Sequence, residues 1–147
     1  MGTAARHVNR TFLILATISA CTAPAPPPGA AGPGEAVQDF AAALQRGDAA
    51  AAYALLSTKT RWEADRLAAQ ARAAAGDAGI APESGRQMLL GSALPQGKVQ
   101  VREVGRDGPD AARVEVIDSS QRARTYRVVR EGPLWKIELD LAARDGG

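Results

Sequence analysis

The chain contains a single thiol, Cys21, and three aliphatic or small residues directly precede it, Ile18, Ser19 and Ala20. A cysteine thiolate is a strong nucleophile and a metal ligand. Because there is no second cysteine, Cys21 cannot form a disulfide within the chain, and a cysteine-rich metal site is excluded. The small residues before it indicate a cleavage region, so Cys21 is expected to lie next to a processing site.

The segment before this site has the parts of an export signal. Arg6 and Arg10 form a positively charged flank, and the run TFLILATISA at 11–20 is apolar. This run is shorter than the roughly 20 residues that a helix needs to cross a bilayer. The sequence therefore predicts a removable signal peptide over residues 1–20 rather than a permanent transmembrane helix.

Residues 18–21 resemble the lipobox of bacterial lipoproteins, which reads aliphatic, small, small, cysteine. In that family the thiol receives a diacylglyceryl group, the chain is cut before the cysteine, and the new amino group is usually acylated, for example with palmitate. The resemblance implies an exported protein that is lipid-anchored to the cell membrane. Thr22 follows in place of aspartate, which implies the outer membrane if the host is Gram-negative.

The alternative is an ordinary secretory leader that is cut near Ala20 or Ala23 and leaves Cys21 as a free thiol. After the cysteine, residues 22–34 contain five prolines, three glycines and no charge. Such a segment favours extended polyproline II structure at about 3.1 Å per residue. We therefore predict that residues 21–34 are a lipidated cysteine and a tether, which reaches up to roughly 40 Å.

Charge and composition exclude several function classes. Without Arg6 and Arg10 the chain carries 16 basic and 16 acidic residues, so the mature protein has no general positive field and is not expected to bind nucleic acid. The only histidine, His7, is lost with the leader. No phosphate-binding loop, nucleophile triad or metal cluster is present, and no cofactor is predicted.

Helical periodicity dominates the first half of the remaining chain. A first helix is predicted from Glu35 to Gly47, with a buried face that consists of Val37, Phe40, Ala41 and Leu44. Asp48 is expected to cap a short second helix. The capping box at 60–63 is expected to start a third helix, which ends at Gly76. A short fourth helix is expected from Pro82 to about Leu90.

From Lys98 onward the period of apolar residues changes to two, which predicts four strands. Their inward residues are expected to be Val99 and Val101, Val114 and Val116, Tyr126 and Val128, and Trp135, Ile137, Leu139 and Leu141. Short turns separate these strands, so neighbouring strands must be antiparallel. The prediction is an α+β domain over residues 35–143, with a tail at 144–147 and the N-terminal helices packed on a curved four-stranded antiparallel sheet.

The opening AVQDFAAALQRGDAAAAYALLS at 36–57 and the closing GPLWKIELDL at 132–141 resemble the nuclear transport factor 2-like superfamily. The resemblance is especially to the small bacterial lipoproteins of unknown function within this superfamily. The resemblance implies a cone in which helices and a concave sheet enclose a pocket. Some members are isomerases or dehydratases, whereas many are not catalytic, so the fold alone does not decide the activity.

Few residues suit acid or base chemistry in such a pocket. Asp39 and Asp65 lie nearest the apolar helix faces, and Tyr53 is a further weak candidate; we expect both carboxylates to point to solvent. Four large aromatic residues are either core anchors or pocket-lining groups: Phe40, Tyr53, Trp62 and Trp135. For Tyr53, Trp62 and Trp135 we favour the core.

Arginines make the third strand basic, at positions 122, 124, 127 and 130. Alternation places Arg127 on the face opposite to the other three, so they do not form one anion-binding patch. Glu138 and Asp140 on the next strand are expected to supply ion pairs on a solvated face.

Three functions follow as expectations. The first is a noncatalytic envelope module that binds a protein, an envelope polymer or a small ligand. The second is a pocket enzyme, an isomerase or hydrolase with a carboxylate base. The third is a structural spacer that associates with itself.

Overall fold

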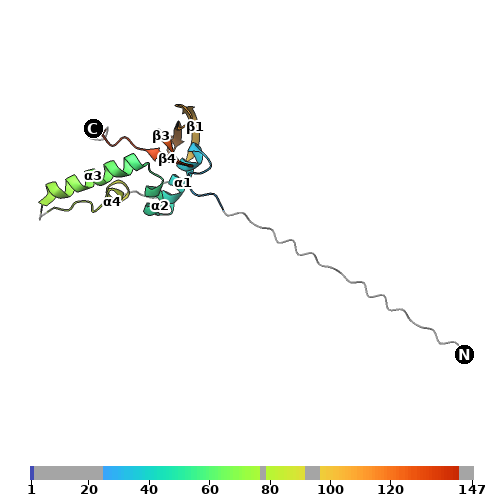
Figure 1. The fold of residues 1–147 in the computed structure, drawn as a ribbon, viewed down its shortest axis with the longest axis horizontal. Coiled ribbons are helices and arrows are strands. Elements are labelled where there is room, and N and C mark those ends of the chain that lie inside the picture. Colours follow the sequence, from blue (N-terminus) through green and yellow to red (C-terminus); the bar gives the residue numbers. More distant parts are fainter. Residues whose placement is uncertain (2–24, 77–78, 92–96, 143–147) are drawn as a thin grey trace.

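The structure is a computed structural model that describes residue 1 and residues 25–76, 79–91 and 97–142. Its elements follow the order α1, α2, α3, α4 and then β1 to β4 (Figure 1). The predicted leader, Cys21 and the other lipobox residues lie outside the described residues, as does the predicted tail at 144–147.

The first two helices begin and end at residues that cap or interrupt a helix. Helix α1 spans Pro33–Gln45 and thus begins two residues before the predicted Glu35, because a proline is well suited to the first turn of a helix. It is followed by Gly47 in the left-handed region, with φ 70°. Helix α2 spans Ala49–Ala54, and the predicted cap is confirmed because Asp48 Oδ1 accepts a hydrogen bond from Ala51 N at 2.9 Å.

Helix α3 spans Thr58–Ala75, and its predicted N-terminal cap was wrong. The cap is Ser57, whose Oγ accepts a hydrogen bond from Thr60 N at 3.1 Å. Ser57 is extended because its N–H donates to Ile137 O at 2.8 Å, so the helix starts directly after this contact. Thr60 lies inside the first turn instead, and its Oγ1 accepts a hydrogen bond from Leu139 N at 2.9 Å.

Helix α4 is short, Gly85–Leu90, and begins three residues later than the predicted start at Pro82. Ser84 caps it by accepting a hydrogen bond from Gln87 N at 3.2 Å. Gly85 is buried against α3, and a Cβ there would lie 2.5 Å from Asp65 N. This close approach explains why a glycine opens the helix.

The strands confirm the predicted α+β fold with one curved antiparallel sheet. They are β1 (Gln100–Arg106), β2 (Ala111–Ile117), β3 (Ala123–Glu131) and β4 (Leu134–Glu138), in the order β1-β2-β3-β4. Leu139 and Leu141 were predicted in the last strand but follow it. The chain leaves the sheet there because the Leu139 N–H bonds to Thr60 on α3 rather than to β3.

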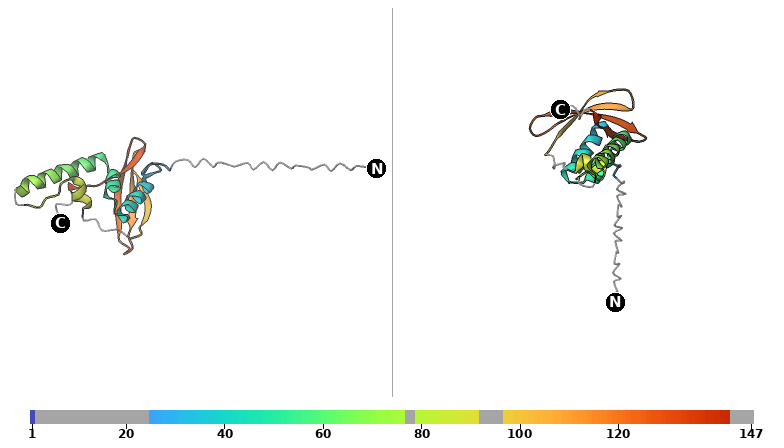
Figure 2. Two further views of the ribbon diagram at one scale, coloured as in Figure 1. Left: turned by 90° about the horizontal axis from the view of Figure 1, so that it is seen from below. Right: turned by 90° about the vertical axis from the view of Figure 1, so that its left-hand side faces the viewer.

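The helices lie on one side of the sheet, and the far end of α3 extends away from it (Figure 2). Helix α1 crosses the inner face and contacts all four strands. The largest fully buried apolar side chains are Val37, Leu56, Val114, Val128 and Ile137, so one core joins the first two helices to the sheet. Among the described residues, no helix is long and apolar enough to cross a membrane.

The outer edge of β4 is covered by segments from far upstream. Ile137 N donates to Leu55 O at 2.9 Å, and Trp135 N donates to Gly29 O at 2.8 Å. Covering an edge strand in this way satisfies its backbone and prevents pairing with other chains. Gly29 therefore belongs to the folded unit, which begins upstream of the predicted boundary at residue 35. The segment that could act as a tether is correspondingly shorter than predicted.

Candidate functional site

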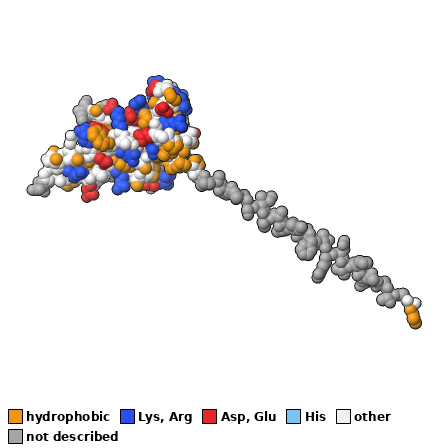
Figure 3. Space-filling model, in the orientation of Figure 1, with side chains coloured by type: hydrophobic (Ala, Val, Ile, Leu, Met, Phe, Trp, Pro, Cys, Tyr) orange, Lys and Arg blue, Asp and Glu red, His pale blue; other side chains and the backbone are white. Residues whose placement is uncertain are grey.

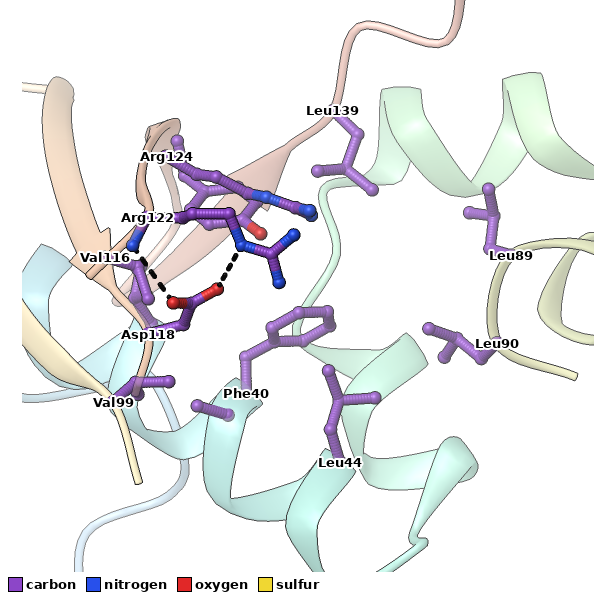
Figure 4. Close-up of a pocket in the computed structure, with 13 residues that line it drawn as sticks. Phe40, Leu44, Leu89, Leu90, Val99, Val116, Asp118, Arg122, Arg124 and Leu139 are labelled. Carbon is purple, nitrogen blue, oxygen red and sulfur yellow. Dashed lines mark hydrogen bonds and ion pairs between the residues drawn. The ribbon is translucent and has the colours of Figure 1, made fainter. Parts of the chain in front are cut away.

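A cavity of about 320 Å³ lies between the inner face of the sheet and the helices α1 and α4. This volume is at the lower end of the range of small-molecule sites, ~300–1,000 Å³. The cavity is partly open to solvent, and Figure 4 shows side chains that line it. Most of the residues that line it are apolar, which makes it the candidate functional site.

The apolar walls come from both layers of the fold. Helix α1 supplies the face that was predicted to be buried, Val37, Phe40, Ala41 and Leu44. Helix α4 and the sheet side add Leu89, Leu90, Val99, Val116 and Leu139. The apolar face of α1, which follows from the 3.6-residue helical period, thus both packs on the sheet and lines the cavity.

The polar side of the cavity lies at the turn between β2 and β3. Asp118, Arg122, Arg124 and Tyr126 line it. Arg122 Nε lies 3.2 Å from Asp118 Oδ2, and Arg122 N donates to Asp118 Oδ1 at 3.1 Å. In Figure 4 the side chains of Arg122 and Arg124 extend side by side toward the space above the Phe40 ring.

Asp118 organises this turn. Its Oδ1 also accepts a hydrogen bond from Ser120 N at 2.8 Å and one from the Ser120 hydroxyl. The hydrogen bonds from Ser120, then those from Arg122 and its positive charge, lower the pKa of Asp118 to about 2. The carboxylate therefore remains ionised at neutral and mildly acidic pH, which makes it a weak base.

Protonation of Asp118 should weaken the fold in acid. A carboxyl group with a lowered folded-state pKa contributes stability above its ordinary value of 3.8, and this stability is lost as the pH falls toward about 2. In urea unfolding across this range, Asp118→Asn should lose less stability with falling pH than the wild type. Asp110→Asn is the control, since the Asp110 side chain makes no hydrogen bond with a described residue. Equal pH slopes for wild type and Asp118→Asn would contradict the assignment.

The two carboxylates that were candidate bases do not line the cavity. Asp39 Oδ2 accepts a hydrogen bond from Gly29 N at 2.9 Å, and Asp65 Oδ1 accepts one from Gly85 N at 2.8 Å. Asp39 is half-buried rather than solvated, whereas Asp65 is exposed as predicted. Both hold a neighbouring segment of backbone in place, so their contacts in the structure are architectural.

Tyr53 also lies outside the cavity. Its hydroxyl donates to Arg61 O at 3.1 Å, and its ring packs against the core. Burial, and then the negative charge of Asp65, raise the pKa of Tyr53 above its ordinary value of 10. The hydroxyl stays protonated at neutral pH, which does not favour a role as a base.

The aromatic residues separate into different environments. Phe40 is buried and lines the cavity. Trp135 is a core residue as predicted, with the Arg106 guanidinium 5.6 Å from its ring centroid. The prediction that Trp62 is a core anchor was wrong, since it is 65% exposed. On α3 the buried residues are Thr60, Ala64 and Ala68, and Trp62 lies about 200° around the helix from Thr60.

Trp62 borders a second hollow of about 580 Å³ beside α3 and β4. The charged groups there pair with each other: Glu138 Oε1 lies 2.7 Å from Arg127 Nη1 and 3.3 Å from Lys59 Nζ. The Arg127 contact confirms the ion pair predicted across these strands. Because both cations already pair with Glu138, this hollow is a poorer candidate than the cavity under α1.

Sequence reasoning missed that Arg122 and Arg124, two arginines of the predicted third strand, border the cavity. The predicted alternation is confirmed for Arg127, which points away from the inner face and pairs with Glu138. Arg124 shares the inner face with Tyr126 and Val128, opposite Val116 on β2. The alternation that separates Arg127 from Arg124 was visible in the sequence, but a cavity beside Arg124 depends on how α1 and α4 pack.

Surface charge is mixed on the face shown in Figure 3, where Lys and Arg side chains alternate with Asp and Glu.

In the part of the chain that the structure describes, no group of three or more His, Cys, Asp or Glu side chains is placed to hold a metal ion.

No family model matches this chain, and neither a curated protein nor a solved structure is significantly similar to it. The sequence motifs and the geometry of the cavity are therefore the features that indicate its function.

Proposed function

We propose that the protein is a lipid-anchored module of the bacterial cell envelope, with a nuclear transport factor 2-like domain that binds a small ligand without transforming it. The observation that carries this proposal is the cavity of about 320 Å³ between α1, α4 and the sheet. Most of the residues that line it are apolar, with a few polar residues on one side, which is the usual composition of a ligand site. The lipobox at 18–21 supports the anchor, and the helices and curved sheet are compatible with the superfamily.

The chemistry of the cavity supports binding over catalysis. The carboxylate at its wall, Asp118, has a pKa of about 2 and is already hydrogen-bonded to Ser120 and Arg122. A general base works best with a pKa near the operating pH. Asp39 and Asp65 hold backbone N–H groups elsewhere. The alternative of an isomerase or hydrolase with a carboxylate base therefore gains no support from the residues around the cavity.

Filling the cavity should abolish binding. The test uses the mature chain, residues 21–147, with Cys21→Ser so that no detergent is needed, and titration calorimetry with the uncharged probe decanol. Ala41→Phe places a ring in the cavity, and its decanol affinity should fall by at least about tenfold because the alkyl chain can no longer be buried. Leu44→Trp is a second variant in case the first does not fold.

Ala50→Phe is the matched control, since Ala50 is exposed on α2 and does not line the cavity. Its affinity for decanol should equal that of the unsubstituted cavity. Binding that survives both Ala41→Phe and Leu44→Trp, or no binding to any of the proteins, would overturn the proposal.

A further inference from the structure

The cavity is chemically asymmetric. At one end Leu44 on α1 and Leu89 and Leu90 on α4 form an apolar wall (Figure 4). At the other end lie Arg122, directly before β3, and Arg124 on β3. An occupant that uses both ends must combine an apolar body with a group that accepts hydrogen bonds from guanidinium.

Among the described residues around the cavity, one cation has no counter-ion. Arg122 is paired with Asp118 through Nε at 3.2 Å, so these two charges compensate each other. Arg124 makes no hydrogen bond or ion pair with any described residue. By contrast, Arg102 pairs with Glu115 at 2.8 Å on the neighbouring strands. The mouth of the cavity therefore carries a net positive charge at Arg124, directly beside apolar walls.

We propose that the ligand is an anionic amphiphile, with a single alkyl chain in the apolar part of the cavity and a carboxylate or phosphate head group bound by Arg124, assisted by Arg122. This inference rests on the proposed function and specifies its ligand. Guanidinium groups match both head groups because they donate paired hydrogen bonds in one plane. The small volume favours a chain of about eight to twelve carbons.

A series of probes with one chain and different head groups tests this inference. The mature chain with Cys21→Ser is titrated with decanoate, decyl phosphate, decanol and decyltrimethylammonium, each below its micelle concentration. Decanoate or decyl phosphate should bind at least about tenfold more tightly than decanol, since a hydrogen bond to a charged group is stronger than one to a neutral group. The tighter of the two anions identifies the head group. The cationic probe should bind most weakly.

Arg124→Gln should remove the preference for the anions over decanol. Arg130→Gln is the matched control, because Arg130 lies on the same strand and inner face but does not line the cavity. It removes the same charge from the protein and should keep the preference. Both side chains are exposed, so both variants should fold, which thermal unfolding verifies.

The outcomes separate the two proposals. Equal affinities for decanol and decanoate, or an anion preference that Arg124→Gln retains, would overturn the anionic ligand but leave a binding cavity. Absence of binding by every probe would overturn both.

Discussion

Cys21→Ser is expected to release the protein from the membrane completely and to remove a lipid-sized increment from its intact mass. The expectation follows from the lipobox resemblance at residues 18–21, in which the cysteine thiol accepts the diacylglyceryl group. Burial of acyl chains contributes about 0.8 kcal/mol per CH₂, and two or more chains hold a protein stably where one does not. The measurement is mass spectrometry and membrane fractionation of the full chain expressed in a bacterium.

Ser19→Ala is the matched control, because it keeps a small residue at the same distance from the cysteine. It should be lipidated and retained in the membrane like the wild type. An unmodified wild-type chain would contradict the anchor. A Cys21→Ser chain that stays in the membrane and keeps the lipid-sized mass increment would also contradict it. In the first case the alternative of an ordinary secretory leader with a free thiol would stand.

A chain that begins at residue 35 is expected to be less stable than one that begins at residue 25, by about 2–4 kcal/mol. The shorter chain loses two hydrogen bonds of Gly29, the one from Trp135 N at 2.8 Å and the one to Asp39 at 2.9 Å. It also loses Pro33, which opens α1. Urea unfolding of the two chains, both ending at residue 147, measures the difference.

Gly29→Ala in the longer chain isolates this contact. Gly29 has φ 82°, and a Cβ there would lie 2.5 Å from Trp135 O. Gly108 has a similar φ of 86° but open space around it, so Gly108→Ala should cost only the backbone strain of about 1–2 kcal/mol. Gly29→Ala should cost clearly more. Equal losses for the two variants, or equal stability of the two truncated chains, would show that the Gly29 contact does not stabilise the fold.

Local patterns predicted much of the fold because the forces behind them act within a few residues. Asp48 caps α2 through a bond to a residue three positions away, and the face of α1 follows from the helical period. The four strands were predicted because alternation within each strand and the turns between them are local features. The errors occurred at boundaries. Ser57 replaced Thr60 as the cap of α3 because its N–H bonds to the distant β4.

The site itself was predicted less well. The face of α1 that lines the cavity was predicted to be buried, and of its residues only Phe40 was also named as a candidate pocket-lining group. Asp39 was expected to point to solvent. In the structure its side chain accepts a hydrogen bond from Gly29, which lies in the segment that the composition predicted to be a tether. Trp62 was expected in the core because large aromatic residues usually are, but its position on α3 turns it outward.

The sequence by itself determined the lipobox prediction, the capped helices, the alternation of the strands and the separation of Arg127 from the other arginines, because each depends on residue spacing along one segment. Only the tertiary structure decided that Gly29 covers the edge of β4 and that Arg124 lies beside an apolar cavity. Both depend on contacts between segments that are distant in the chain. A spacing pattern specifies which face a side chain occupies, whereas packing of α1 and α4 against the sheet determines what that face meets.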